Sequence, residues 1–186
     1  KISVDIGFIV FNYETYPNLI KFFEENKVEI EKSNMSFSVS VKKTIFEYCG
    51  KGLNGIFSNR LNLLNYKFYK MFFDIIKFYK KCENLNQFNE KISLGEYLNK
   101  EKLSKEFINF HLIPMVSAIW SMPPYEANQM PMKFFLNFFK NHGLFKLKNR
   151  PQWFTVSNRS RAYVNNILSK ISGEHFKNYS VNKIKS

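Results

Sequence analysis

The chain is poor in the residues that build the commonest disulfide and metal sites. It has two cysteines, Cys49 and Cys82, which lie far apart and outside any C-x-x-C motif. This usage favours a reduced, cytosolic chain over a secreted disulfide scaffold. The three histidines, His111, His142 and His175, stand singly and without an H-E-x-x-H motif. We therefore expect structural or surface roles for the histidines, and no bound metal.

Other signatures are missing as well. The chain contains no P-loop, no G-x-S-x-G elbow and no Cys/His pair that would suggest a hydrolase nucleophile. No apolar run approaches the about 18 residues that a membrane-spanning helix needs, and the start at Lys1 has no signal-peptide architecture. These absences argue against the hydrolase, P-loop and membrane-spanning classes.

Acidic residues are outnumbered, at 15 Asp and Glu against 28 Lys and Arg, which gives a formal net charge of +13. Clustered cations bind phosphate by counterion release. Here the cations are mostly lysines, scattered one or two at a time along expected helical faces, with no Arg-rich arm or zinc-finger spacing. We favour a solvated lysine face and expect no nucleic-acid partner. A basic helical module that binds anionic membrane or nucleic acid without catalysis remains the alternative function.

The chain does contain enough apolar residues to form a globular core. Hydrophobic residues make up 45% of the 186 residues and aromatic residues 18%. This composition suits one good-sized globular domain or two small ones. The period of the apolar residues then indicates which elements surround the core.

The stretch DIGFIVFNYETYP, residues 5–17, predicts a buried strand followed at once by a helix. Residues 8–11 form an apolar run after Gly7, and Pro17 opens an amphipathic helix. A buried strand needs neighbours, and we expect them further along the chain or in sequence outside it. The start on lysine indicates a fragment of a longer protein.

A small antiparallel sheet is expected next, at about 35–57. Residues 35–42 alternate apolar and polar side chains, as a half-buried strand does. Residues 44–48 form the expected partner, and the glycines of residues 50–55 form a turn into a short third strand near 56–57.

Helices are expected from about 61 to 142. An apolar stripe with a period of 3.6 residues predicts a long helix from Leu61 to about Lys81. Ser93 and Glu96 have the spacing of a capping box for a short helix. Ser104 can cap a further helix to Leu112, which Pro114 is expected to stop.

The remaining elements lie in the C-terminal half. Residues 115–131 hold three of the six prolines and predict a packed, irregular loop. Residues 134–139 predict an aromatic helix that ends at His142 and Gly143. Ser157 is expected to cap a last helix closed by Gly173, and residues 178–184 alternate like a strand. The fold class predicted from these patterns is α+β, mostly helical with a small antiparallel sheet.

Five blocks span most of the chain: DIGFIVFNYETYPNLIKFFEENKV, MSFSVS, HLIPMVSAIWSMP, FFLNFFKNHGLF and RPQWFTVSNRSRAYV. In this order they resemble a family of predicted flavin-dependent oxidoreductases, the amine-oxidase-like FAD/NAD-binding proteins related to phytoene desaturases. The resemblance implies that this chain is an internal fragment of such an enzyme, and that the glycine-rich phosphate turn of the Rossmann-like unit precedes residue 1.

The resemblance also implies a domain plan. Residues 1–16 would be a strand and turn of the FAD-binding domain, and residues 17–150 the substrate-binding domain. Residues 151–186 would return to the FAD-binding domain. FAD, bound non-covalently, would be held mainly by sequence outside this chain, because the phosphate turn and its helix N-terminus lie there.

The function implied is hydride transfer from an organic, apolar or lipid-like substrate to flavin, with the full-length parent as the enzyme and this fragment inactive alone. The expected partner is a hydrophobic small molecule. The expected location is cytoplasmic, with peripheral contact to an anionic membrane as an option for the lysine face. A structural or interaction domain without chemistry is the third hypothesis.

By resemblance, six residues contact the flavin cofactor: Asp5, Gly7, Phe8, Asn12, Ser160 and Arg161. Gly7 would let the backbone approach the ring closely, although a buried strand with a glycine bulge explains the same pattern. A plain helix N-cap equally explains the residues near Ser160. The family has two glycines before this serine, where Asn158 and Arg159 stand here.

The resemblance gives no catalytic residues. Four aromatic residues could line an apolar substrate pocket. They are Trp120, Tyr125, Phe135 and Trp153. Packing in the core is the alternative role for aromatic side chains at helical spacing.

Overall fold

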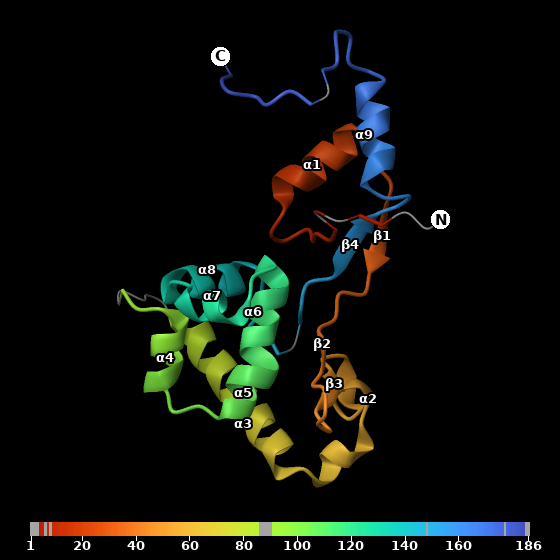
Figure 1. The fold of residues 1–186 in the computed structure, drawn as a ribbon. Coiled ribbons are helices and arrows are strands. Elements are labelled where there is room, and N and C mark those ends of the chain that lie inside the picture. The colour runs from red at the N-terminus through yellow and green to blue at the C-terminus, as the bar shows by residue number, and fades with distance from the viewer. Residues whose placement is uncertain are drawn as a thin grey trace. The chain divides into compact units, whose positions relative to one another are not determined.

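The computed structural model describes residues 4–5, 7, 9–85, 91–147, 149–176 and 178–184. The chain divides into two compact units, one of residues 1–33 with 153–186 and one of residues 34–152. We call them the terminal unit and the central unit. Helices dominate the described residues, and two sheets of two antiparallel strands accompany them, which confirms the α+β class (Figure 1).

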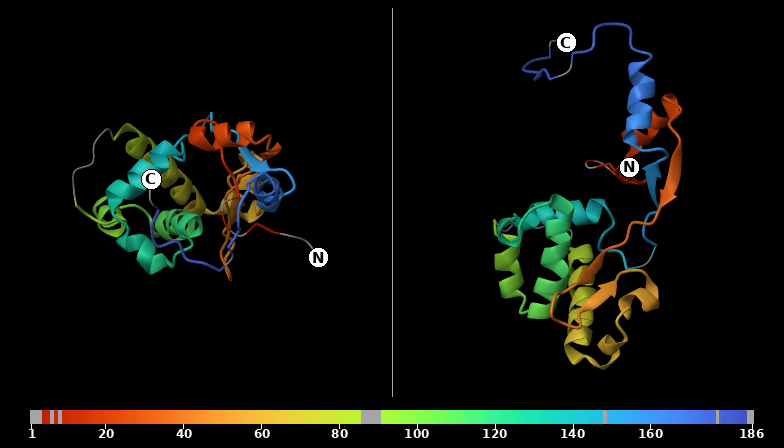
Figure 2. Two further views of the ribbon diagram at one scale, coloured as in Figure 1. Left: turned by 90° about the horizontal axis from the view of Figure 1, so that it is seen from above. Right: turned by 45° about the vertical axis from the view of Figure 1, so that its right-hand side comes forward.

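The terminal unit pairs segments from the two ends of the chain. β1 (Ile30–Ser33) runs antiparallel to β4 (Trp153–Val156), with Ile30 opposite Val156. α1 (Pro17–Glu25) lies beside α9 (Ser160–Leu168) in Figures 1 and 2, and Tyr163 contacts Phe23 with ring centroids 5.3 Å apart. The helix predicted at Pro17 is therefore confirmed. It packs with the chain termini, whereas the expected domain plan grouped it with residues 17–150.

The predicted strand at residues 8–11 is not formed as expected. Among the described residues of this stretch, only Phe11 pairs, through an isolated bridge to Phe154. Phe11 is fully buried, but Ile9 is 51% exposed. An apolar run alone does not make a strand, because a ladder needs a partner of matching length. Phe8 lies outside the described residues.

Two further predictions for the terminal unit are wrong. Ser157 does not cap α9, which begins at Ser160; its N-cap residue is Arg159, whose side chain makes no capping hydrogen bond. The described residues 178–184 form no strand and no β-bridge with another described residue. An alternating pattern forms a strand only where a neighbouring strand supplies the ladder hydrogen bonds.

The central unit begins with the predicted hairpin. β2 (Ser38–Ser40) runs antiparallel to β3 (Glu47–Cys49), with Val39 opposite Tyr48. Residues 56–57 do not form a third strand. Instead α2 (Gly52–Ile56) follows β3, because Gly52 takes a positive φ of 67° and the Phe57 N–H donates to the Leu53 carbonyl, which closes a helical turn.

The long helix starts later than its apolar stripe. A 3₁₀ turn, η1 (Arg60–Leu64), precedes α3 (Tyr66–Asn84), and the Asn65 side chain accepts from the Lys67 N–H at the junction. Leu61 therefore lies outside the helix and is exposed. The capping box is confirmed: Ser93 and Glu96 bond each other's backbone N–H at the start of α4 (Leu94–Lys100).

The segment around Pro114 differs most from expectation. Ser104 caps α5 (Lys105–Phe107) as predicted, but the chain continues through a π turn, η2 (Ile108–Leu112), into α6 (Ile113–Trp120). Pro114 does not end the helix, because the Phe110 carbonyl, which lacks the N–H donor that a non-proline residue would supply at position 114, accepts from the Tyr48 hydroxyl instead.

Residues 115–131 are mostly helical rather than an irregular loop. α6 ends at Trp120, the chain turns at Ser121 with a positive φ of 51°, and α7 (Pro124–Gln129) follows. The prolines fall between or at the start of helices, which explains why they do not break one. The aromatic helix α8 (Met132–Asn141) and its end at His142 and Gly143 are confirmed.

The two units have separate cores. In the central unit α3, α4 and α8 bury aromatic rings together, among them Phe78 and Phe135, and Phe145 from the segment after α8 packs against Phe135. In the terminal unit the buried apolar cluster consists of Phe11, Ile20, Phe23 and Val156. Among the described residues, no helix is both long and apolar enough to cross a membrane.

Candidate functional site

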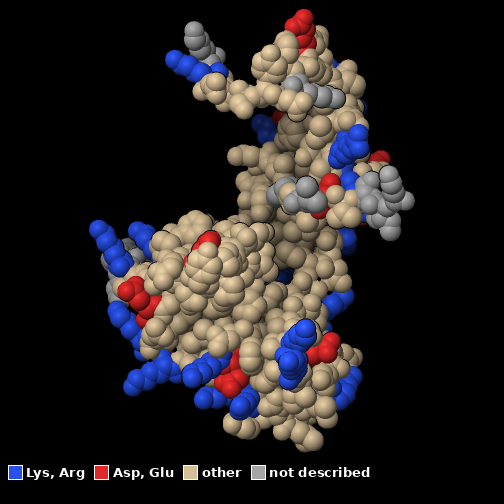
Figure 3. Space-filling view, in the orientation of Figure 1, with Lys and Arg blue, Asp and Glu red and all other residues tan. Residues whose placement is uncertain are grey.

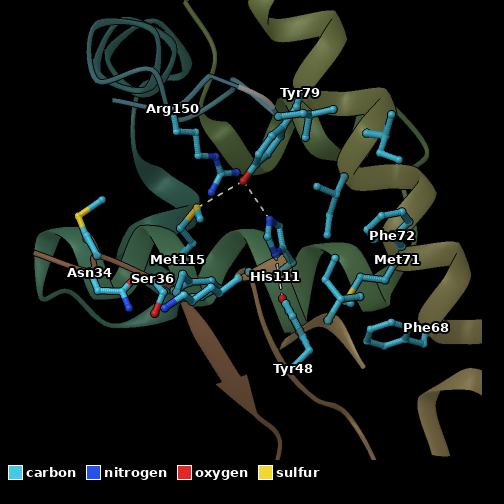
Figure 4. Close-up of a pocket in the computed structure, with 18 residues that line it drawn as sticks. Asn34, Ser36, Tyr48, Phe68, Met71, Phe72, Tyr79, His111, Met115 and Arg150 are labelled. Atoms are coloured by element: carbon cyan, nitrogen blue, oxygen red, sulfur yellow. Dashed lines mark hydrogen bonds between the residues drawn. The ribbon is translucent and has the colours of Figure 1, made fainter. Parts of the chain in front are cut away.

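A cavity of about 430 Å³ lies within the central unit, between the β2–β3 hairpin, α3 and the π turn η2 (Figure 4). Most of its wall is apolar. The α3 face contributes Phe68, Met71, Phe72, Ile75 and Ile76, and α6 contributes Met115. Such a wall follows from the apolar stripe of α3, whose cavity side is not covered by another helix.

Three side chains form a hydrogen-bonded row in this cavity. His111 lies between two tyrosines: its Nδ1 is 2.8 Å from the Tyr48 hydroxyl, and its Nε2 is 2.9 Å from the Tyr79 hydroxyl. Figure 4 shows the row, with Tyr48 from β3, His111 from the π turn and Tyr79 from α3. We call it the Tyr–His–Tyr row. All three side chains are buried.

The backbone near His111 determines the direction of these hydrogen bonds. Pro114 has no N–H, so the Phe110 carbonyl four residues earlier lacks its usual helical donor. The Tyr48 hydroxyl donates to this carbonyl at 3.0 Å. With its only hydrogen used there, the Tyr48 oxygen accepts from His111 Nδ1–H. Nε2 of His111 then accepts from Tyr79, so we assign the neutral Nδ1–H tautomer.

The row is uncharged. Burial, and to a smaller extent the nearby Arg150 cation, together lower the pKa of His111 to about 3. Burial also raises the pKa of Tyr79, which Arg150 partly opposes, and raises the pKa of Tyr48. At neutral pH the row therefore orients hydroxyl groups but holds no ionised base.

Arg150 brings a positive charge to the cavity. It is exposed at the cavity's edge, and Figure 4 shows its guanidinium turned toward the Tyr79 hydroxyl. Its Nε donates to the Lys146 carbonyl at 2.8 Å, which fixes the side chain's base. Across the described ranges, no carboxylate forms an ion pair with Arg150. Its remaining N–H groups can thus bind an anion in the cavity.

A second cavity, of about 560 Å³, lies in the terminal unit beside the loop from β4 to α9. Its lining includes the carboxylates of Asp5 and Glu31. Asp5 accepts a hydrogen bond from the backbone N–H of Ser160 at 3.2 Å, at the first residue of α9. The helix N-terminus that could attract an anion is thereby occupied by a carboxylate of the chain itself.

The loop in this cavity has an unusual backbone. Asn158 and Arg159 have positive φ values of 60° and 72°, and Arg159 combines this φ with a ψ of 166°. This is backbone geometry that glycine adopts most easily. These are the positions at which the resembled family has glycines.

The other predicted flavin contacts are distributed around the terminal unit. Asn12 is fully buried, and its Oδ1 accepts from the Thr15 N–H at 2.9 Å. Its Nδ2 is buried without a hydrogen-bond partner. Gly7 has open space where a Cβ would stand, so packing does not require glycine there. Arg161 is exposed on α9.

The four predicted substrate residues differ in their surroundings. Phe135 is fully buried in the core of the central unit, and Trp120 packs on Phe138 with ring centroids 4.5 Å apart. Tyr125 is 69% exposed, and its hydroxyl bonds Glu126. Trp153 belongs to the terminal unit. None of the four lines the cavity of the Tyr–His–Tyr row, whose lining residues sequence reasoning did not select.

The glycines at residues 50–55, expected as a turn, have the spacing G-x-G-x-x-G of dinucleotide-binding turns. Their surroundings do not match that motif. β3 is antiparallel to β2, and α2 has only five residues, so no parallel βαβ unit surrounds them. A Cβ at Gly55 would lie 2.8 Å from the Cys49 carbonyl oxygen, which explains the last glycine by packing.

No protein-family model matches this chain, and no curated protein is significantly similar to it. Among the described residues, no group of three or more His, Cys, Asp or Glu side chains could hold a metal ion.

Proposed function

We propose that this chain is part of an FAD-dependent oxidoreductase and that its central unit supplies the substrate cavity. The cavity with the Tyr–His–Tyr row carries this proposal. Its volume of about 430 Å³ falls in the usual range for small-molecule sites, and a mostly apolar wall with a few converging polar groups is typical of them. Residues 34–150 of the central unit fall within the part of the chain that the resemblance assigns to the substrate.

The cavity suits an organic molecule with an apolar body and one anionic group. Phe72, Met71 and Ile75 offer an apolar wall, and Arg150 offers charged donors beside the Tyr79 hydroxyl. A guanidinium that has no acidic partner among the described residues binds a carboxylate or phosphate strongly, because the hydrogen bond is charge-assisted. A medium-chain carboxylate meets both requirements.

FAD, when bound, would supply the hydride acceptor. The residues of the central unit would bind and orient the substrate. The hydrogen-bond direction in the row leaves the lone pairs of the Tyr79 oxygen available to donors, and the apolar wall excludes water. His111 stays neutral and therefore acts as a positioning residue for Tyr79.

Two features of the terminal unit support the proposed contact with the cofactor. The unpartnered Nδ2 of buried Asn12 is a donor in need of an acceptor, and the left-handed backbone at Asn158 and Arg159 occupies the positions of the family's glycines. The carboxylates of Asp5 and Glu31 suit hydroxyl groups but repel pyrophosphate. The proposal therefore requires a phosphate-binding glycine turn elsewhere in the full reading frame.

The charge distribution favours this function over nucleic-acid binding. On the face shown in Figure 3, lysine and arginine side chains are spread over the surface and form no continuous stripe. Nucleic-acid sites usually gather cations along one face.

Two measurements test the proposal. The protein encoded by the full reading frame should purify with visible flavin absorbance, or acquire it when FAD is added. This chain should bind decanoate more tightly than decanol in calorimetric titration. Arg150→Gln should weaken decanoate binding roughly 10- to 100-fold, because it removes a charge-assisted hydrogen bond, and leave decanol binding unchanged.

Tyr125→Phe, which removes an exposed hydroxyl remote from the cavity, is the matched control and should change neither affinity. A colourless full-length protein that takes up no FAD would overturn the oxidoreductase assignment. Equal binding of decanoate by wild type and Arg150→Gln would overturn the assigned cavity chemistry.

A further inference from the structure

The segment that links β3 to α3 has an inverted distribution of polar and apolar side chains. Within η1, Asn62 is fully buried, whereas the leucines around it face outward. The exposed fractions are 75% for Leu53, 57% for Leu61, 46% for Leu63, 90% for Leu64 and 74% for Tyr66. Folded surfaces usually show the reverse, and a continuous exposed apolar surface marks an interaction site. We call residues 52–66 the leucine segment.

Hydrogen bonds to the hairpin hold this inverted arrangement in place. Asn62 Nδ2 donates to the Glu47 carbonyl at 2.9 Å, and Ser58 Oγ donates to the same carbonyl at 3.1 Å. Asn59 Nδ2 donates to the Ile45 carbonyl at 3.2 Å, while its Oδ1 accepts from the Leu61 N–H. The polar side chains are used to attach the segment to the protein, which leaves the leucines facing solvent.

The charged residues near the leucine segment indicate what kind of partner it binds. Residues 48–73 contain no Asp or Glu, and they contain four cations: Lys51, Arg60, Lys67 and Lys70. All four are exposed, and Lys67 alone of them lies near a carboxylate in the described structure, 4.0 Å from Glu106. In Figure 3 the lowest end of the central unit, below the place where Figure 1 shows α2, is an uncharged tip, and blue and red side chains lie above it.

Exposed leucines and a tyrosine flanked by cations match a membrane surface with anionic headgroups. The apolar side chains can enter the boundary between headgroups and acyl chains, and the cations can contact lipid phosphates. A second copy of this chain is a poorer partner, because its leucine segment would bring the same cations into contact with these.

We propose that the leucine segment docks this protein on an anionic lipid surface. Docking does not depend on the oxidoreductase activity. It does have a consequence for the substrate cavity, because three residues within two positions of the leucine segment or inside it also line that cavity: Lys51, Ile56 and Phe68. An apolar anion dissolved in the membrane would thus meet the protein next to its binding site.

Co-sedimentation with vesicles tests this. The chain should bind vesicles of phosphatidylcholine mixed with phosphatidylglycerol, bind pure phosphatidylcholine weakly, and dissociate as salt is raised. Leu61→Gln with Leu64→Gln should lower binding roughly tenfold or more. Arg60→Gln with Lys70→Gln should lower it roughly 25-fold, at about fivefold per charge.

Leu168→Gln with Ile171→Gln is the matched control, since these residues of the terminal unit are also exposed, at 41% and 52%. This control should bind like wild type. Circular dichroism checks that each variant is folded, and the charge variant supplies an independent result if the leucine variant is not.

Wild-type protein that fails to bind the mixed vesicles would overturn the proposal, as would equal binding by wild type and both segment variants. Sedimentation equilibrium tests the alternative that the leucine segment binds a second copy of this chain. A dimer that the leucine variant dissociates, with vesicle binding unchanged, would assign the segment to a second copy and overturn lipid docking.

Discussion

At the scale of single residues, His111 makes the stability of the central unit depend on pH. Burial, together with the nearby Arg150 cation, lowers its pKa to about 3 in the folded chain. In the unfolded chain its pKa is about 6.5. Between these values the unfolded chain binds a proton that the folded chain does not. Stability therefore decreases as the pH falls below about 6.5 and continues to decrease toward about 3. We expect a loss of about 2 kcal/mol between pH 7 and pH 5, measured by urea unfolding.

The variant His111→Gln separates the pH dependence of stability that His111 causes from the pH dependence that carboxylate groups cause. Glutamine keeps one donor and one acceptor in the Tyr–His–Tyr row but has no proton to gain in this range. The variant should be less stable than wild type at pH 7, and its stability should fall less between pH 7 and pH 5. Parallel pH profiles for the two proteins would contradict the assignment of a buried, neutral His111.

The residues of the cavity show what sequence alone can and cannot predict. Tyr79 lies on the apolar stripe predicted for the long helix, and Tyr48 lies in a predicted strand, so their burial follows from periodicity. Their contact with His111 does not follow from periodicity. Tyr48 and His111 are 63 residues apart, and periodicity does not say which elements face each other. The same limit explains why Phe135, chosen for the pocket, belongs to the core.

At the scale of elements, Ser104 supports the helix that carries His111. Its Oγ accepts from the Phe107 N–H, and its own N–H donates to Asp74 on α3 at 2.9 Å. Ser104→Ala should lower the free energy of unfolding by about 1 kcal/mol, as loss of an N-cap does. It should also weaken decanoate binding, because the π turn that positions His111 follows directly.

Ser93→Ala provides the comparison. It removes the cap of α4, which contributes no residue to the cavity, and should cost about 1 kcal/mol as well. Decanoate affinity should remain that of wild type. Equal affinity losses in the two variants, measured by calorimetry, would show that the cavity responds to stability in general and not to the position of η2.

The elements that sequence predicted best are those with local signals. The confirmed caps at Ser93 and Ser104, the helix at Pro17 and the end of α8 at Gly143 depend on residues within one turn. The segment around Pro114 was mispredicted because its outcome depends on a distant group: the Tyr48 hydroxyl bonds the Phe110 carbonyl that proline leaves without a donor. The prediction of a strand at residues 8–11 was wrong for a related reason, since strand pairing depends on partners that local sequence does not specify.

At the scale of the whole molecule, the two units differ in how much core they have. The central unit buries an extended aromatic cluster that joins α3, α4 and α8. In the terminal unit the buried cluster among the described residues comprises only Phe11, Ile20, Phe23 and Val156, with half-buried side chains around it. Because stability increases with the apolar surface removed from water, the central unit should be the more stable of the two.

The two tryptophans allow this to be measured, since Trp120 belongs to the central unit and Trp153 to the terminal unit. In Trp120→Phe, fluorescence reports the terminal unit, and in Trp153→Phe it reports the central unit. We expect the urea midpoint of Trp120→Phe fluorescence to be lower than that of Trp153→Phe, and decanoate to raise only the latter, because a ligand stabilises the unit that binds it. Coincident midpoints that decanoate shifts together would instead mean that the two units unfold as one cooperative structure.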